Sequence, residues 1–419
     1  MKTNSRTPIF VTLDVESPHL CGTLWCDAIR GKEVFSFEYA DSWLGSGRRF
    51  LLDPLLPLHR GPQYAQTSNF GIFLDSAPDR WGRFLIKRRE ALKARKEERP
   101  PRLLKETDYL LGVHDVYRMG ALRFQKSTDG PFLDNDPHFS APPWASLRDL
   151  EFASLAIEKE NASEQSDYEK WLKMLIAPGG SLGGARPKAS VVDEHGALWL
   201  AKFPGRTDAS DVGAWEMVVH RLARQAGLCL PEARIGQFTS AHHTFMVKRF
   251  DRTEKGKRLF FMSAMTSLGR SDGDDASSGV SYLHLAELLQ KYGSKPKEDL
   301  QELWSRMLFH VLISNTDDHL RNHGFLIDEQ GWRLSPAYDL NANPDGEGLK
   351  LNISEDDNSQ SQELILSVAK HFRFKNIQAE ERYLEMKSVV RSWRTVAAEH
   401  GLSRSEMETM APAFRLAQV

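Results

Sequence analysis

The sequence predicts an α+β fold in which a β-rich N-terminal subdomain precedes two lobes, one mixed α/β and one helical. Three observations carry this prediction. Residues 8–40 alternate between apolar and polar side chains in short runs, residues 189–250 hold two strand pairs around one amphipathic run, and from about residue 281 the apolar spacing becomes helical. A chain of 419 residues is also too long for one small core.

Composition and charge exclude several classes of protein. The chain is 41% hydrophobic and 27% charged with a formal net charge of −2, so it is not a generally basic nucleic-acid-binding protein. Cys21, Cys26 and Cys229 form no Cys-x-x-Cys pair and indicate reduced thiols rather than a disulfide framework or a zinc site. No signal peptide and no membrane span is expected, which favours a cytoplasmic protein without a membrane partner.

The N-terminal subdomain is expected to span residues 1–125. Its last predicted helix begins after Ser76 or Asp79 and runs to about Lys96, with a strongly basic sequence. That face is either a solvated surface with i,i+4 ion pairs or a contact for an acidic partner. A segment rich in Pro, Asp, Ser and Gly, residues 126–145, is predicted to be a linker.

The second lobe is expected over residues 146–250 and opens with a glycine-rich loop. Gly183 and Gly184 follow Ser181 in this loop, and their backbone amides can bind phosphate, with Lys188 adding positive charge. The loop matches neither the Walker pattern nor the kinase glycine-rich pattern, so a flexible turn is the alternative interpretation.

The remainder of this lobe has the order of a protein-kinase small lobe. A hairpin over residues 189–203 ends at Lys202, a helix over 213–226 carries Glu216, and two strands lie within 234–250. Lys202 is predicted to contact ATP phosphates and to pair with Glu216. The alternatives are a lysine that extends to solvent and a surface glutamate.

The helical lobe, residues 251–419, contains a dense polar cluster. Asp317 and Asn322 have the Asp-x-x-x-x-Asn spacing of a kinase catalytic loop, and a predicted hairpin then leads to Asp339. An amide oxygen and a carboxylate are ligands that suit Mg²⁺. A polar loop of turn-forming residues is the alternative, but burying so many polar groups beside the apolar run at 308–313 is costly unless they are paired or bind metal.

Four motifs in this order resemble the HipA family of bacterial serine/threonine kinases, the toxins of HipA/HipB toxin–antitoxin pairs. The resemblance covers residues 145–345 well and the first 125 residues more loosely. It rests on the segments SLGGARPK at 181–188, VKRFDR at 247–252, NTDDHLRN at 315–322 and PAYDL at 336–340.

The resemblance implies a bilobal, protein-kinase-like fold and a role for each matched residue. Asp317 looks like the catalytic base, Asn322 and Asp339 the Mg²⁺ ligands, and Lys202 the contact to ATP phosphates. The hinge at the adenine corresponds to residues 248–250, so Lys248 and Phe250 are expected to bind it mainly through backbone groups. Asp318 beside Asp317 makes this loop more acidic than is usual in the family.

The resemblance also implies regulation and partners. Ser181 matches the loop serine that family members phosphorylate in trans, which silences the kinase by placing a dianion where ATP phosphates bind. ATP and Mg²⁺ are the implied cofactors. The implied partners are a protein substrate, for which family targets include aminoacyl-tRNA synthetases, and a HipB-like helix-turn-helix antitoxin through which DNA is contacted only indirectly.

Two other functions remain open at the level of sequence. A metal-dependent hydrolase could use Asp317, His319, His323 and Asp339 as ligands, although the His-x-x-x-His spacing requires a helix that Gly324 argues against. A non-catalytic kinase-like module could act as a corepressor with the antitoxin. The complete set of kinase residues disfavours that alternative.

Overall fold

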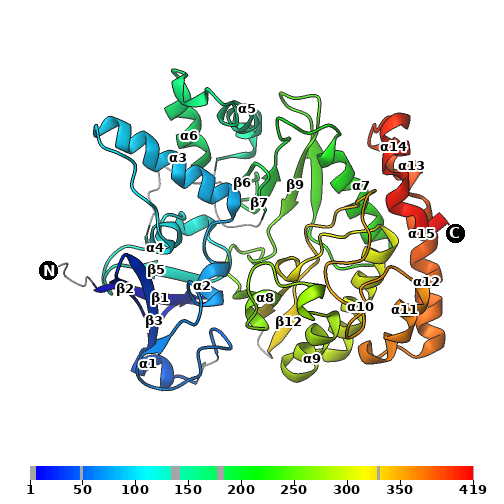
Figure 1. Cartoon of the computed structure of the whole chain (residues 1–419), viewed down its shortest axis with the longest axis horizontal. Coiled ribbons are helices and arrows are strands. Elements are labelled where there is room, and N and C mark those ends of the chain that lie inside the picture. Colours follow the sequence, from blue (N-terminus) through cyan, green and yellow to red (C-terminus); the bar gives the residue numbers. More distant parts are fainter. Residues whose placement is uncertain (1–5, 48–50, 134–141, 177–183, 328–330, 419) are drawn as a thin grey trace. The chain divides into compact units, whose positions relative to one another are not determined.

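The computed structural model describes residues 6–47, 51–133, 142–176, 184–327 and 331–418 (Figure 1). The chain divides into two compact units. Unit 1 comprises Met1–Arg206 and Asp251–Met262, and unit 2 comprises Thr207–Phe250 and Ser263–Val419. The division falls inside the expected second lobe, and the expected domain boundaries stay predictions.

Unit 1 begins with an antiparallel sheet of strand order β4-β3-β2-β1-β5. Alternating side chains of these strands are buried because one face packs on helices. Phe73 of the short helix α2 lies 5.6 Å from the ring of Phe37 in β3 and 6.1 Å from that of Phe124 in β5, measured between ring centroids. The strands are β1 Arg6–Asp14, β2 Pro18–Ile29, β3 Lys32–Tyr39, β4 Gln63–Tyr64 and β5 Leu122–Gln125.

The predicted helix that ends at about Lys96 is confirmed as α3. Asp79 caps α3, since its carboxylate accepts a hydrogen bond from the backbone N–H of Gly82 at 2.7 Å. The helices are α1 Asp41–Leu44, α2 Gly71–Asp75, α3 Arg80–Lys96, α4 Glu106–Leu111, α5 Leu147–Ile157 and α6 Tyr168–Ile176. The predicted hairpin is formed by β6 Lys188–Val192 and β7 Leu198–Lys202.

The return of the chain to unit 1 depends on a buried carboxylate. Asp251 is fully buried and accepts hydrogen bonds from the backbone N–H of Gly120 at 2.8 Å and from Arg252 at 2.6 Å. Arg258 donates to the carbonyl oxygen of Asp115 at 2.7 Å. Burial of such a charge is tolerated only because it is paired.

Unit 2 contains helix α7 Val212–Gln225, which packs on β8 Ala233–Gly236 and β9 Thr244–Lys248. Its central helix is α10 Pro296–Leu312, whose apolar side chains are almost all buried. The later helices, orange to red in Figure 1, pack on one another and on α10. The other elements are β10 Phe261–Ser263 at the unit boundary, α8 Ala264–Ser267, α9 Tyr282–Tyr292, β11 Gly324–Ile327, β12 Trp332–Leu334, α11 Gln362–Ser367, α12 Asn376–Arg391, α13 Trp393–Glu399, α14 Arg404–Met410 and α15 Arg415–Gln418.

The structure divides one predicted helix near the C-terminus into two helices. The sequence favours a single helix over residues 376–399, but the chain turns at Ser392 between α12 and α13. The hydroxyl and the backbone N–H of Ser392 both donate to the carbonyl of Val389, at 2.7 and 3.0 Å. A serine that bonds back to the preceding turn competes with helix continuation. Within the described residues, no helix has both the length and the apolarity needed to cross a bilayer.

The start of α7 tolerates no side chain at Gly213. A Cβ built on Gly213 would lie 2.0 Å from the carbonyl oxygen of His243. We therefore expect Gly213→Ala to destabilise unit 2 by about 3 kcal/mol through overpacking, although alanine normally favours a helix. Urea unfolding followed by circular dichroism measures the change. Gly47→Ala, at an open position, is the control, and equal midpoints for the two variants would contradict the prediction.

Candidate active site

The predicted hairpin after the catalytic-loop motif is confirmed. Strand β11 pairs antiparallel with β12 in the register Phe325–Leu334, and the backbone N–H of Ser335 donates to the carbonyl of Gly324 at 2.8 Å. This register places the segment after Leu334 beside the segment before Gly324. The two polar stretches that the hairpin separates in sequence are therefore brought to the same end of it.

The loop between α10 and β11, residues 313–323, is called the catalytic loop below after its motif. Hydrogen bonds within this loop link Asp317 to Asn322. Asp317 is exposed, and its carbonyl oxygen accepts hydrogen bonds from the backbone N–H of His319 at 2.9 Å and from Nδ2 of Asn322 at 3.1 Å. Since Nδ2 of Asn322 is used in this way, the amide oxygen is the atom with which this side chain can bind a cation. The carboxylate of Asp317 remains directed to the surface.

Tyr338 joins the three segments that the sequence singles out in unit 2. Its hydroxyl donates to the carbonyl of Arg321 at 2.7 Å, and its ring centroid lies 5.3 Å from that of Phe250. Phe250 belongs to the expected hinge, Arg321 precedes Asn322, and Asp339 follows Tyr338 in sequence. One tyrosine therefore joins the expected hinge and the expected catalytic loop to the segment that contains Asp339.

The residues expected to bind Mg²⁺ fit that ion in donor chemistry. Asp339 has the left-handed backbone conformation with φ +59°, which is unusual for a residue other than glycine. Nδ2 of Asn341 lies 3.3 Å from the carbonyl oxygen and 3.5 Å from the carboxylate of Asp339. A carboxylate and an amide oxygen, completed by water and substrate phosphates, are what Mg²⁺ prefers.

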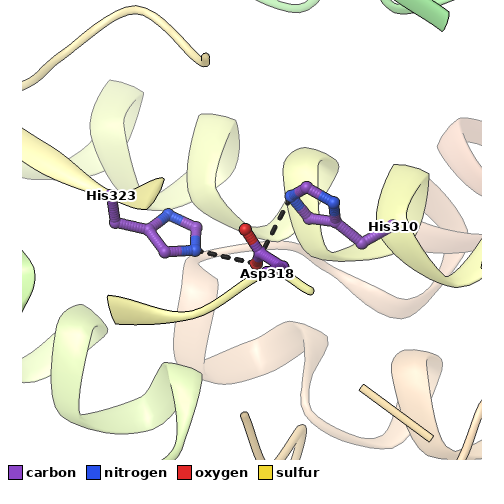
Figure 2. Close-up of side chains that lie close together, drawn as sticks. All are labelled: His310, Asp318 and His323. Carbon is purple, nitrogen blue, oxygen red and sulfur yellow. Dashed lines mark hydrogen bonds and ion pairs between the residues drawn. The ribbon is translucent and has the colours of Figure 1, made fainter. Parts of the chain in front are cut away.

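A fully buried polar cluster lies behind the catalytic loop (Figure 2). Oδ2 of Asp318 lies 2.8 Å from Nε2 of His323 and 3.4 Å from Nε2 of His310, and it also accepts a short hydrogen bond from the hydroxyl of Tyr282. Nδ1 of His310 lies 2.8 Å from Nδ2 of Asn315. Asp318 and its neighbour Asp317 are therefore in opposite environments, one buried and one exposed.

Burial sets the protonation of this cluster. Desolvation lowers the pKa of His310 to about 4, against a smaller opposing effect of Asp318. Burial alone would raise the pKa of Asp318, but the imidazoles of His310 and His323 and the hydroxyl of Tyr282 hold it below its usual range. Desolvation and the nearby carboxylate raise the pKa of Tyr282. At neutral pH His310 is therefore neutral, and the carboxylate beside it accepts hydrogen bonds from His323 and Tyr282.

The ligand set expected of a metal-dependent hydrolase is not assembled in the part of the chain that the structure describes. The group of metal-capable atoms found within 4.8 Å of one another belongs to His310, Asp318 and His323. His323 faces Asp318, whereas the hydrolase hypothesis combined it with Asp317, His319 and Asp339. The hypothesis therefore loses its geometric basis.

Two contacts hold the catalytic loop from the C-terminal side of unit 2. Arg415 of α15 donates to the hydroxyl of Ser314 at 2.9 Å, and Ser314 itself has φ +50°. Nδ2 of Asn343 donates to the hydroxyl of Thr316 at 2.8 Å. The segments that begin and follow the loop are thus tied to distant parts of the sequence.

The predicted ATP-binding residues are distributed over both units. Lys202 ends β7 in unit 1, and Glu216 lies in α7 of unit 2. Glu216 is 6% exposed, so the alternative of a surface glutamate is excluded, while its pairing with Lys202 stays a prediction. Lys248 ends β9, where its backbone N–H donates to the carbonyl of Glu232 at 2.8 Å.

Lys188 has a different environment from the one expected. Its side chain is 3% exposed, and its Nζ donates to the carboxylate of Asp79 at 2.9 Å and to the carbonyl of Gly184 at 3.2 Å. Trp81 donates from Nε1 to the carbonyl of Lys188 at 3.0 Å. Lys188 thus fastens the end of the glycine-rich loop to the start of α3. Ser181 and Gly183 lie outside the described residues.

Sequence reasoning missed the residues that support the loop from inside. His310 lies within an apolar helical run, and Tyr282 and Asn315 carry no motif of their own. In the sequence Asp318 stands out only as an additional acidic residue of the loop. One feature of the sequence does point to this inward face. Asp318 directly follows Asp317 and His323 directly follows Asn322, so one residue of each adjacent pair can face inward.

The basic helix α3 forms ion pairs and polar contacts within unit 1. Lys93 lies 3.8 Å from Glu97, Lys96 lies 2.6 Å from Glu169, and Arg95 donates to the carbonyl of Ser163 at 2.8 Å. Several basic side chains of α3 are therefore already paired within unit 1. This agrees with the interpretation of the helix as a solvated face with ion pairs.

The fold and this arrangement of residues define a kinase-like chain, and comparison with known proteins gives its family. Residues 180–394, slightly more than half of the chain, match the HipA-like C-terminal domain. The chain belongs to the HipA-like family.

Similar proteins agree with this assignment. A candidate kinase of Sinorhizobium fredii, Y4mE, is 27% identical over an alignment of 181 residues, and the match covers 38% of this chain and 41% of that protein. A candidate kinase of Haemophilus influenzae is 24% identical over an alignment of 219 residues, and the match covers 50% of this chain and 60% of that protein. The matches thus span less than two thirds of either relative's length.

The fold extends over almost the whole chain. HipA of Shewanella oneidensis, solved in a complex of HipA, HipB and operator DNA, covers 98% of this chain and 96% of its own with a TM-score of 0.68 at 18% identity. The expected fold class, a β-rich N-terminal subdomain followed by a kinase-like α+β fold, is confirmed.

The neutral His310 predicts a pH-dependent stability. The folded pKa of about 4 lies below the ordinary value near 6.5, so between these values the unfolded chain binds a proton that the folded chain does not. Stability is fully present above pH 6.5 and should fall by up to about 3 kcal/mol as pH drops to 4. Urea unfolding at pH 7 and 4.5 measures the loss. His310→Asn should reduce this dependence, and an unchanged dependence would refute the assignment.

The buried Asp79–Lys188 pair predicts strong energetic coupling. Lys188→Met leaves a buried carboxylate without its cation and should cost about 3–5 kcal/mol. Adding Asp79→Asn should recover part of this loss because no buried charge then remains. A double-mutant cycle from urea unfolding of the four proteins gives the coupling energy. A coupling near zero would show that the two side chains act independently.

Proposed function

We propose that this protein is an ATP- and Mg²⁺-dependent serine/threonine protein kinase. The observation that carries the proposal is the junction at Tyr338, which joins Phe250 of the expected hinge to the catalytic loop and precedes Asp339. Family membership and the candidate-kinase designations of two relatives support the same activity. The fold similarity to HipA of Shewanella oneidensis agrees with it.

In this proposal each group has one task. The exposed carboxylate of Asp317 orients a substrate hydroxyl and accepts its proton. Asn322 and Asp339 would hold Mg²⁺, which supplies charge neutralisation at the phosphates when bound. Backbone groups at Lys248 and Phe250 would receive the adenine.

The binding of phosphates is assigned mainly to unit 1. Lys202, steadied by Glu216, would contact the ATP phosphates, and the backbone amides of Gly183 and Gly184 would bind them. Lys188 would hold the end of this loop through Asp79, and its own contact with phosphate remains a prediction.

We further propose autophosphorylation on Ser181 and neutralisation by a HipB-like antitoxin. A phosphate on Ser181 would place a dianion in a loop suited to ATP phosphates and so repel the nucleotide. The antitoxin is proposed because HipA of Shewanella oneidensis is found with HipB and operator DNA. An aminoacyl-tRNA synthetase is the proposed class of external substrate, and DNA would be contacted through the antitoxin.

The test is phosphate transfer by the wild type and an Asp317→Ala variant. With Mg²⁺ and ATP, intact mass and phosphopeptide mapping should give phosphate on Ser181 in the wild type and a rate lower by about 10²–10⁴-fold in the variant, since it lacks the general base. Asp356→Ala removes another exposed carboxylate of unit 2, so it is the control for the loss of surface charge and should match the wild type.

The contrary outcome has a defined meaning. The wild-type mass must first show that Ser181 is unmodified. If ATP then binds but neither protein gains phosphate, autophosphorylation is refuted and the corepressor module becomes the better hypothesis. Equal rates for the wild type and Asp317→Ala would remove Asp317 from its role.

A further inference from the structure

The buried cluster of Asp318, His310, His323 and Tyr282 has no role among the groups that would touch ATP, Mg²⁺ or a hydroxyl. All four side chains are at most 2% exposed. The hydroxyl of Tyr282 and Nε2 of His323 hydrogen-bond to Oδ2 of Asp318, and Nε2 of His310 lies 3.4 Å from the same oxygen. Figure 2 shows the two imidazole rings on either side of this carboxylate. Burying a carboxylate is costly, so these contacts to one buried oxygen require an account of what they stabilise.

The positions of Asp318 and His323 in the sequence indicate that the cluster stabilises the loop that contains Asp317 and Asn322. Asp318 directly follows Asp317, and His323 directly follows Asn322. The 2.8 Å contact between Asp318 and His323 therefore joins the two residues that directly follow the proposed functional residues. The 3.1 Å hydrogen bond from Asn322 to the carbonyl of Asp317 joins the functional residues themselves.

The cluster also connects this loop to two helices. His310 lies in α10 and Tyr282 at the start of α9. Both side chains reach Oδ2 of Asp318, so the loop is fixed to the helical core rather than to a neighbouring loop. Rigid helices hold a functional group more closely than a loop can.

The hydrogen bonds disfavour a metal ion in this cluster. The NH₂ group of Asn315 is a donor and lies 2.8 Å from Nδ1 of His310, so that nitrogen accepts and the ring proton is on Nε2. Nε2 then carries the ring proton, 3.4 Å from Oδ2 of Asp318, and has no lone pair for a metal. Binding a metal would require the tautomer of His310 and the amide of Asn315 to change together.

We propose that Asp318 and His323 are positioning residues that set the distance between the base Asp317 and the Mg²⁺ ligand Asn322. This inference rests on the proposed kinase function and adds the device that aligns its two groups. A displacement of about 1 Å at a reacting group can cost about 10²-fold in rate. Loss of the Asp318–His323 contact should therefore affect turnover and the Mg²⁺ requirement more than nucleotide binding.

The experiment compares Asp318→Ala, Asp318→Asn and His323→Gln with the wild type. Asp318→Ala should lower kcat about 100-fold while the KM for ATP changes less than about threefold. Asp318→Asn keeps an acceptor oxygen and should recover about tenfold of that loss. His323→Gln keeps a donor, and the half-saturating Mg²⁺ concentration should rise several-fold because Asn322 is adjacent.

A matched control separates positioning from general stability. Arg382 links α12 to the carbonyl of Ala226 and has no described contact with the catalytic loop. Arg382→Gln should lower the unfolding midpoint without changing kcat or the Mg²⁺ requirement. If kcat falls with the midpoint alike in Asp318→Ala and Arg382→Gln, the positioning role is refuted.

Two further readouts complete the test. Hydrogen exchange over residues 314–323 should accelerate in Asp318→Ala but not in Arg382→Gln, and this measurement holds even if the wild type transfers no phosphate. Failure of the kinase function is thereby distinguished from failure of the positioning role. Unchanged exchange and kcat in a folded Asp318→Ala protein would overturn the proposal. Stoichiometric zinc or iron in the wild type, lost in His323→Gln together with activity, would also overturn it in favour of a metal site.

Discussion

The burial of the Asp318 carboxylate is the constraint on which the candidate site depends. A carboxylate in the protein interior is stable only if other groups replace the water that it loses. Here Tyr282 of α9 and His323 at the end of the loop hydrogen-bond to Asp318, and the imidazole of His310 in α10 lies 3.4 Å away. Because these groups are far apart in sequence, the carboxylate is satisfied only when the helices and the loop are correctly packed. The buried charge therefore favours the one loop conformation in which its partners are all in place.

The orientation of the exposed residue Asp317 depends on the burial of its neighbour Asp318. With Asp318 directed inward, Asp317 faces the surface, and the short β11–β12 hairpin returns the chain to the same place. Tyr338 then contacts Phe250 and the loop carbonyl of Arg321. Two residues with positive φ, Ser314 and Asp339, lie at the edges of this arrangement, where backbone strain is maintained by the surrounding contacts.

Unit 1 shows the same principle around the glycine-rich loop. Lys188 carries the charge expected of a phosphate-binding residue, yet its ammonium is buried against Asp79, which also caps α3. One carboxylate therefore serves both the helix and the end of the loop. A motif residue may match its family in sequence, but its neighbours decide whether its charge is available to a ligand or already paired.

The sequence by itself predicted the main strands and helices, a cap of α3 at Ser76 or Asp79, the hairpin after the catalytic loop and the resemblance to the family, because these depend on local spacing and turn chemistry. It also predicted that Asn322 and Asp339 lie at the same end of that hairpin. Only the tertiary structure decided the inward face of the loop, the pairing of Lys188 and the break at Ser392. His310, Tyr282 and Asp318 are separated by up to 36 residues, and a hydrogen bond between such residues depends on packing that no local pattern encodes.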